Sequence, residues 1–153
     1  MEAVTAFFDA DEWPYAAVDA TGLQLAFQGS SGSWACLVRV RELEQRVLFY
    51  SYLPARVPVG RRHAMAEFVL RANYGLMLGN FEFDLDDGEV RFKTSIDVDG
   101  AELGHILMKH VAYANVLTFD RYFQAAMAVA LAGMAPLDGI RLSEGEPAPV
   151  EEA

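Results

Sequence analysis

The chain has 153 residues, a formal net charge of −10 and a hydrophobic content of 53%. The length fits one domain, and the acidic balance excludes the polyphosphate backbone of nucleic acids as a direct partner. Counting Gly in place of Tyr, as the usual apolar class does, raises the apolar share to about 57%, above the usual ~45–50%. We expect such a surplus to lie in a surface patch that a second copy covers, which makes the protein a homodimer.

The spacing of apolar side chains predicts the elements of the first half. Residues 2–11 have helical spacing, which indicates a short amphipathic helix. From residue 15 to residue 53 apolar and polar side chains alternate, which predicts four antiparallel strands. Tight turns are expected to join these strands, at residues 19–22, 28–33 and 42–45.

The middle of the chain predicts a helix followed by a hairpin. Residues 61–74 return to helical spacing, and Gly75 is placed to cap that helix. Residues 79–93 alternate again around Asp87-Gly88, which predicts a β-hairpin with a two-residue loop. The facing pairs expected from this loop are Leu85 with Val90, Phe83 with Phe92, Asp84 with Arg91 and Glu82 with Lys93.

The last third is helical from Glu102 to Gly133, but its apolar stripe changes face at Thr118. This predicts either two helices that meet at Thr118 or one helix that is buried on opposite sides along its length. We expect one domain over residues 1–142 and a disordered acidic tail over 143–153. The two stripes comprise Leu103, Leu107, His110, Ala114 and Leu117, and then Phe119, Phe123, Met127 and Ala130.

A search for catalytic and metal-binding patterns predicts neither. His105 and His110 are five residues apart, about 140° around a helix, so they cannot present ligands to one metal as a four-residue spacing does. Residues 29–33 read as a turn and not as a nucleophile elbow, and residues 84–88 lack the ligand spacing of a calcium loop. We therefore expect no catalytic residues, no metal and no cofactor, and a protein that is not an enzyme.

Two groups of polar residues remain as candidates. Arg39 and Arg41 share one face of a predicted strand, which indicates either a solvated sheet face or a site for an acidic ligand. Asn73, Asn115 and Asp120 lie in or near helical stripes, where we expect them to cap helices or bond to the backbone.

The sequence predicts a cytoplasmic location without membrane contact. Its first residues have no basic region of the kind that opens a signal peptide. No segment approaches the ~18 uninterrupted apolar residues that a membrane-spanning helix needs.

Four segments, 67–74, 79–84, 88–94 and 114–122, resemble the YbjN family of bacterial proteins, and the resemblance covers residues 67–130. The family is similar in fold to the class I chaperones of type III secretion, which are small acidic α+β homodimers. Its members are described as regulators of sensory transduction or stress, and no catalytic residue is attributed to them. The family-motif positions, which the resemblance implies are structural, are Asn73, Gly79, Asn80, Phe81, Glu82, Asp84, Arg91, Asn115 and Asp120.

The resemblance thus implies an α+β fold: an antiparallel sheet with a short N-terminal helix, a middle helix and C-terminal helices. The main hypothesis is a homodimeric adaptor, chaperone-like or regulatory, in bacterial stress response or signalling. Its acidic surface favours a protein partner with a basic surface, such as a nucleic-acid-binding protein. The alternative is a regulator that senses a small molecule in a pocket between sheet and helices, with Arg39 or Arg41 as a contact.

Overall fold

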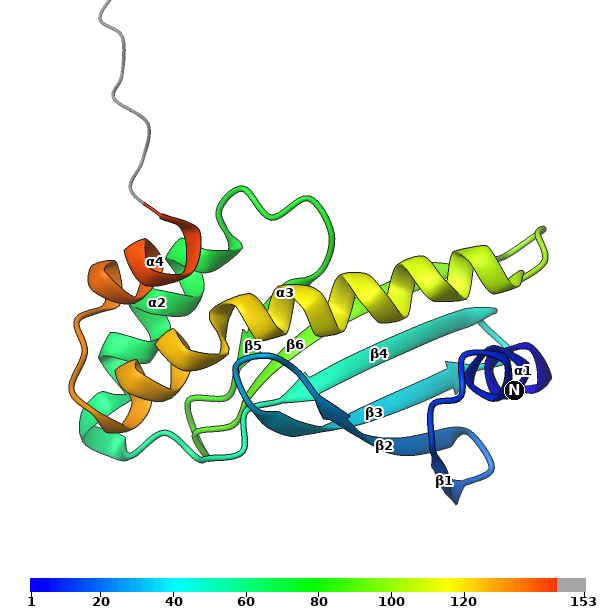
Figure 1. Cartoon of the computed structure of the whole chain (residues 1–153), viewed down its shortest axis with the longest axis horizontal. Coiled ribbons are helices and arrows are strands. Elements are labelled where there is room, and N and C mark those ends of the chain that lie inside the picture. Colours follow the sequence, from blue (N-terminus) through cyan, green and yellow to red (C-terminus); the bar gives the residue numbers. More distant parts are fainter. Residues whose placement is uncertain (146–153) are drawn as a thin grey trace, which may run out of the picture.

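The computed structural model describes residues 1–145 and contains one six-stranded antiparallel sheet with four α-helices. The strand order is β1-β2-β3-β4-β6-β5 (Figure 1). In chain order the elements are α1 (Glu2–Ala10), β1 (Ala16–Asp19), β2 (Gly22–Gln28), β3 (Ser33–Arg41), β4 (Arg46–Tyr52), a 3₁₀ turn (Val59–Arg61), α2 (Arg62–Asn73), β5 (Asn80–Phe83), β6 (Val90–Asp97), α3 (His105–Leu131) and α4 (Pro136–Glu144). The α+β fold and the antiparallel sheet predicted from the sequence are confirmed.

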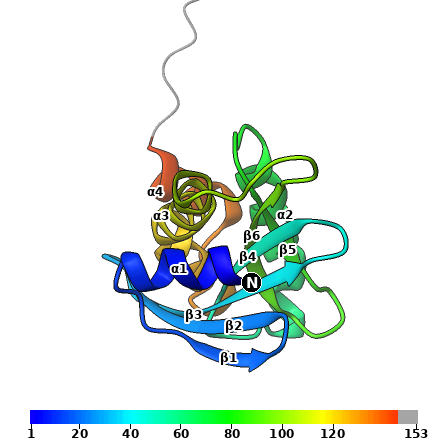
Figure 2. The same cartoon turned by 90° about the vertical axis from the view of Figure 1, so that its right-hand side faces the viewer.

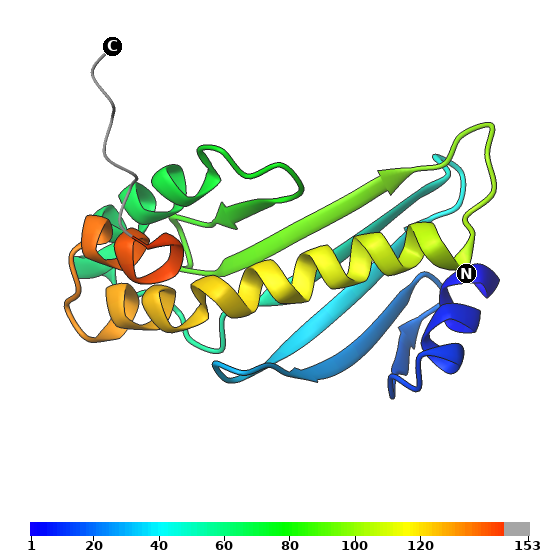
Figure 3. The ribbon, with the colours of Figure 1, turned by 45° about the horizontal axis from the view of Figure 1, so that its top comes forward.

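The helices cover one face of the sheet and one of its ends. Helix α3 runs along the sheet and packs on β4 and β6, with α1 beside its N-terminal end (Figures 1 and 2). Helices α2 and α4 pack against each other and against α3, and α2 also lies on β5 (Figure 3). No helix within residues 1–145 lies on the opposite face of the sheet.

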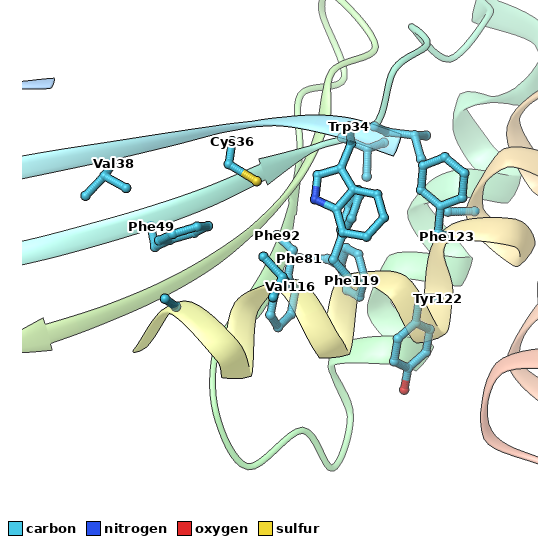
Figure 4. Close-up of a cluster of buried hydrophobic side chains, with 14 of the residues drawn as sticks. Trp34, Cys36, Val38, Phe49, Phe81, Phe92, Val116, Phe119, Tyr122 and Phe123 are labelled. Atoms are coloured by element: carbon cyan, nitrogen blue, oxygen red, sulfur yellow. The ribbon is translucent and has the colours of Figure 1, made fainter. Parts of the chain in front are cut away.

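The core lies between α3 and the sheet and is rich in aromatic side chains (Figure 4). Trp34 of β3 contacts the rings of Phe119 and Phe123 of α3, with centroid distances of 5.0 and 5.4 Å. Phe81 and Phe92 join this cluster from β5 and β6. Each fully buried ring of this kind contributes roughly 1.5–3 kcal/mol of hydrophobic stabilisation.

Helix α3 is a single helix with one continuous buried stripe, so the predicted change of face at Thr118 is wrong. The second predicted stripe is essentially correct, because Phe119 and Phe123 are buried. The first stripe is wrong, because Leu107 and Leu117 are 37% and 61% exposed. The buried residues instead form one face along the whole helix: Met108, Val111, Ala112, Asn115, Val116, Phe119, Tyr122, Phe123, Ala125, Ala126, Val129 and Ala130.

The predicted register of the β5–β6 hairpin is also wrong, by two residues. Phe81 pairs with Phe92, and Phe83 pairs with Val90. A shift of two keeps every side chain on its predicted face, but it replaces the two-residue loop by a loop over residues 84–89. The longer loop is held by local bonds: Asp84 Oδ1 accepts the N–H of Asp86 at 2.8 Å.

Gly88 fixes the far side of that loop. Its carbonyl accepts the N–H of Val57 at 2.9 Å, and its φ is +81°. A Cβ at Gly88 would lie 2.5 Å from the carbonyl oxygen of Val57. The close approach of these two backbones, which the hairpin sequence alone does not indicate, therefore selects the observed loop.

The C-terminal boundary differs from the expected one. Helix α4 includes Ser143 and Glu144, which the sequence assigned to the acidic tail. Tyr122 of α3 donates a hydrogen bond to the Glu144 carboxylate, and burial together with that bond raises the pKa of Tyr122 to about 12. The remainder of the predicted tail, residues 146–153, lies outside the described residues.

One property relevant to membranes follows from the helix sequences. Within residues 1–145, every helix is too short or too polar to cross a bilayer.

Candidate functional site

Asn73, at the end of α2, covers the outer edge of β5. Its side-chain amide accepts the N–H of Phe81 at 2.7 Å and donates to the carbonyl of Phe81 at 3.0 Å. Asn73 therefore pairs with β5 as another strand would. The backbone N–H and C=O of Phe81 point away from β6 and toward Asn73. The side chain blocks the edge against pairing with a foreign strand.

Asn115 holds α3 to the centre of the sheet. It is fully buried, and its amide nitrogen donates to the carbonyls of Phe49 and Phe92 at 2.9 and 3.1 Å. Its oxygen accepts the hydroxyl of Ser51 at 2.6 Å, and Ser51 in turn accepts the indole N–H of Trp34. Every hydrogen-bonding group of this buried network has a partner, as a stable core requires.

Asp120 holds the β2–β3 turn to α3. Its carboxylate accepts the backbone N–H groups of Ser30 and Ser31 at 3.0 and 2.8 Å. Burial alone would raise the pKa of Asp120, but the hydrogen bonds from Ser30 and Ser31 outweigh it and hold the pKa below its usual value. The carboxylate is thus occupied as an anchor for the turn.

The remaining motif residues lie in and around the β5–β6 hairpin. Glu82 forms ion pairs with both Arg91 and Lys93 of β6. Gly79 lies so close to β6 that a Cβ there would be 2.6 Å from the carbonyl oxygen of Lys93. Asn80 begins β5 and opposes Lys93. All of these contacts position the chain itself.

The histidines are not brought together. His105 contacts Asp11 at 3.2 Å, which ties α3 to the segment after α1, whereas His110 lies about 1.4 turns further along α3. His63 is near the start of α2. Across residues 1–145 no three His, Cys, Asp or Glu side chains form a group that could hold a metal ion.

Arg39 and Arg41 lie on the sheet face opposite to the helices. Arg39 forms an ion pair with Asp19 of β1, and this pairing, with hydrogen bonds from Thr21, lowers the pKa of Asp19 to about 2. No part of α3 can share a ligand with these two arginines, because the sheet separates them. The predicted contact of Arg39 or Arg41 with a ligand in a pocket between sheet and helices is therefore wrong.

Sequence analysis missed an apolar groove of about 300 Å³ between β6 and the N-terminal half of α3. We call it the edge groove. Met77 and Ile106, which precede the lining residues Leu78 and Leu107 in the chain, are 95% and 68% exposed. The first apolar stripe predicted for α3 was the signal in the sequence that could have indicated the groove, because three of its residues, Leu107, His110 and Ala114, line it. Its lining residues are Leu78, Gly79, Thr94, Ser95, Ile96, Leu107, His110, Val111 and Ala114.

The edge groove lies beside an unpaired strand edge. β5 begins opposite Lys93, whereas β6 continues to Asp97. Every second residue of an antiparallel strand bonds to the same neighbouring strand. Ser95 and Asp97 therefore direct their N–H and C=O groups to the same side as Lys93, where β5 no longer runs beside β6. Within the described chain no strand pairs with this part of β6 on that side.

Comparison with known proteins identifies the family. A model of the YbjN family, described as "Putative bacterial sensory transduction regulator", matches residues 1–126. The chain belongs to the YbjN family. The match extends the resemblance seen in the sequence to the first 66 residues, which are part of the same family domain. No protein with a curated description matches the chain.

Three solved structures have a similar fold. The match with a structure of the HopA1-SchA chaperone-effector complex covers 80% of this chain and 91% of the matched chain, with 15% identity and a TM-score of 0.55. The crystal structure of YbjN from E. coli covers 76% and 89%, with 10% identity and a TM-score of 0.51. The ExsC-ExsE complex covers 80% and 91%, with 13% identity and a TM-score of 0.50. The fold predicted from the family resemblance is therefore confirmed.

Proposed function

We propose that this member of the YbjN family is a non-enzymatic adaptor, chaperone-like or regulatory, that binds a segment of a partner protein. The observation that carries the proposal is the edge groove beside the unpaired half of β6. An extended segment can add to this edge through backbone hydrogen bonds while every second side chain enters the groove.

The comparisons support binding rather than chemistry. Two of the similar structures are complexes of two different proteins, one of them named a chaperone-effector complex. Because one fold hosts many functions, this likeness supports the proposal only together with the groove. The family description favours a role in signalling. A role in stress response and a cytoplasmic location are further parts of this proposal.

The proposed adaptor acts as a homodimer. Leu70 of α2 and Tyr74, which caps that helix, are 75% and 91% exposed and line one hollow. In the loop that follows, Met77 and Leu78 are 95% and 62% exposed, and Leu78 lines the edge groove. Large apolar side chains that lie exposed together are covered by a partner in many proteins. A second copy that covers some of these side chains leaves the others to the partner segment.

The test is affinity capture from native lysate with mass spectrometry, together with light scattering of the purified protein. Leu107→Asp places a charge in the edge groove, and Leu137→Asp, at an exposed position of α4, is the matched control. We expect a dimer and a reproducible partner that Leu107→Asp loses and Leu137→Asp retains. A strict monomer that captures nothing, or equal capture by both variants, would overturn the proposal.

The second candidate is a regulator that senses a small molecule. The observation in its favour is the size of the edge groove, about 300 Å³, at the lower end of the range for ligand pockets. A ligand there would contact α3 and β6, and not Arg39 or Arg41. A metabolite that raises the melting temperature of the wild type but not of Leu107→Asp would favour this candidate.

A further inference from the structure

The loop between α2 and β5 displays an apolar side chain that its own chain leaves uncovered. Leu76, Met77 and Leu78 follow one another between Gly75 and Gly79, and the loop projects from the molecule in Figure 1. Leu76 packs against the core and Leu78 lines the edge groove, whereas Met77 is 95% exposed. Exposed loops normally carry polar residues, so we expect another molecule to cover Met77.

The edge groove has the size and the lining to receive a methionine side chain. Its volume of about 300 Å³ equals that of roughly ten water molecules, which leaves room for one unbranched side chain. Leu107, Val111 and Ala114 line one side of the groove, and Ile96 lines the other. Methionine adapts to irregular apolar gaps of this kind. Met77 does not fill the groove of its own chain, because it is almost fully exposed.

The surface around the groove carries no acidic residue. Its three segments, 68–81, 90–96 and 103–119, contain none of the 22 Asp and Glu residues of the chain. Of the groove lining, only His110 can carry a charge. A strongly charged occupant therefore finds no counter-charge in the groove, which fits an uncharged apolar side chain. The lysine and arginine side chains of the three segments pair with carboxylates or with an aromatic ring of the same chain: Arg71, Arg91, Lys93 and Lys109.

A second copy of the chain supplies such an occupant. Two molecules of net charge −10 repel each other, and the repulsion is weakest where both present a surface without carboxylates. Met77 directly precedes Leu78, which lines the groove, so the protruding side chain and the groove are neighbours on one surface. A twofold axis between them places Met77 of each copy in the groove of the other, which is the reciprocal contact of an isologous dimer.

We propose that in the homodimer Met77 of each copy fills the edge groove of the other. The inference rests on the proposed function and specifies its dimer contact, in which each groove is completed by a residue of the second copy. A partner segment can enter a groove only when it displaces Met77. The dimer therefore covers the groove until the partner binds, and partner binding weakens this contact by the same factor as the contact weakens partner binding.

The first test measures the dissociation constant of the dimer by light scattering over a concentration series. Met77→Ser removes one apolar side chain from each of the two contacts, and we expect it to weaken the dimer by at least ~10-fold. Met77→Leu should keep the wild-type value. Leu43→Ser is the matched control, because Leu43 is 97% exposed in the turn between β3 and β4 and does not line the groove. Equal dissociation constants for Met77→Ser and the wild type would overturn the inference.

The second test locates Met77 by disulfide formation between copies. Met77→Cys is mixed with His110→Cys, which places a thiol in the groove lining, and the buried Cys36 does not compete. We expect a disulfide that joins the two variants. Lys109→Cys is the matched control, because Lys109 is exposed but lies outside the lining, about 100° around α3 from His110. Equal disulfide formation with both helix variants, or none with either, would show that Met77 does not enter the groove.

The outcomes separate this inference from the proposed function. A dimer that forms without the Met77 contact would overturn the inference and leave the homodimer in place. A monomer would overturn both the homodimer and this contact. Capture of the partner through the edge groove is measured separately with Leu107→Asp, so partner binding can stand in either case.

Discussion

The carboxylate of Asp120 in α3 accepts the backbone N–H of Ser31 at 2.8 Å, and so joins the β2–β3 turn to a helix 89 residues later in the chain. The neighbouring Gly29 leaves room for this contact, since a Cβ there would lie 2.4 Å from Oδ1 of Asp120. The turn and the helix are consequently fixed as one unit.

We expect Asp120→Asn to lower the free energy of unfolding by about 1–3 kcal/mol, because the amide replaces one charged acceptor by a donor that faces the N–H groups of the turn. Urea unfolding followed by circular dichroism measures the change. Gln124→Ala, at an exposed position of the same helix, serves as the control and should remain within about 0.5 kcal/mol of the wild type.

The same carboxylate predicts a pH dependence. The pKa of Asp120 is lowered in the folded state, since the hydrogen bonds from Ser30 and Ser31 outweigh burial. Its stabilisation is therefore fully present above the pKa of an unfolded Asp, about 3.9, and is lost as the pH falls through the folded-state pKa. Below about pH 4 the stability of the wild type should fall more steeply than that of Asp120→Asn. Parallel curves for the two proteins would contradict this role.

Asn115 and Ser51 should be energetically coupled. Asn115→Ala removes the hydrogen bonds to the carbonyls of Phe49 and Phe92 and the acceptor of the Ser51 hydroxyl, and we expect a loss of about 2–4 kcal/mol. Ser51→Ala should remove part of the same network, so the double variant should lose less than the two single losses added together, by about 1 kcal/mol. Urea unfolding followed by tryptophan fluorescence measures all three variants. Additive losses would show that the contacts act independently.

Removal of the Asn73 side chain should expose the edge of β5. We expect Asn73→Ala to cost about 1–2 kcal/mol and to increase concentration-dependent association, because the N–H and C=O of Phe81 become available to a foreign strand. Light scattering over a concentration series detects the association. Arg71→Ala, an exposed position on the same helix, is the comparison, and equal association of both variants would rule out edge protection by Asn73.

Gly88 lies in the loop of the β5–β6 hairpin, and Gly100, which follows β6, is a matched comparison for it. Both have positive φ, +81° and +74°, but only Gly88 has backbone atoms where a Cβ would be placed. Gly100→Ala should cost about 1 kcal/mol for the conformation alone, and Gly88→Ala should cost clearly more because the loop must move away from Val57. Equal losses in thermal unfolding would mean that the contact with Val57 is easily relieved.

The sequence predicts the order of helices and strands because each follows from local spacing. The alternation around Trp34 and Cys36 indicates a strand without reference to any other part of the chain. The side chains of the hairpin were placed on the correct faces for the same reason. Its register was not, because Val57, a residue 31 positions earlier, holds Gly88.

The site was less predictable than the fold. An apolar stripe such as Leu103 to Leu117 is normally buried, and local spacing cannot reveal that β5 stops opposite Lys93 and leaves this flank of α3 uncovered. For Arg39 and Arg41, alternation placed both on one face of a strand, but it could not say which face the helices would cover.

The position of α3 in the chain affects how the protein is made. The strands that it covers, β4 and β6, are synthesised before it, and α3 ends only at Leu131. During translation the part of the inner sheet face that α3 covers, which includes Phe92, stays exposed until that segment emerges. A nascent chain that pauses before residue 105 would therefore expose an aggregation-prone surface, so folding of this domain depends on completing its last third.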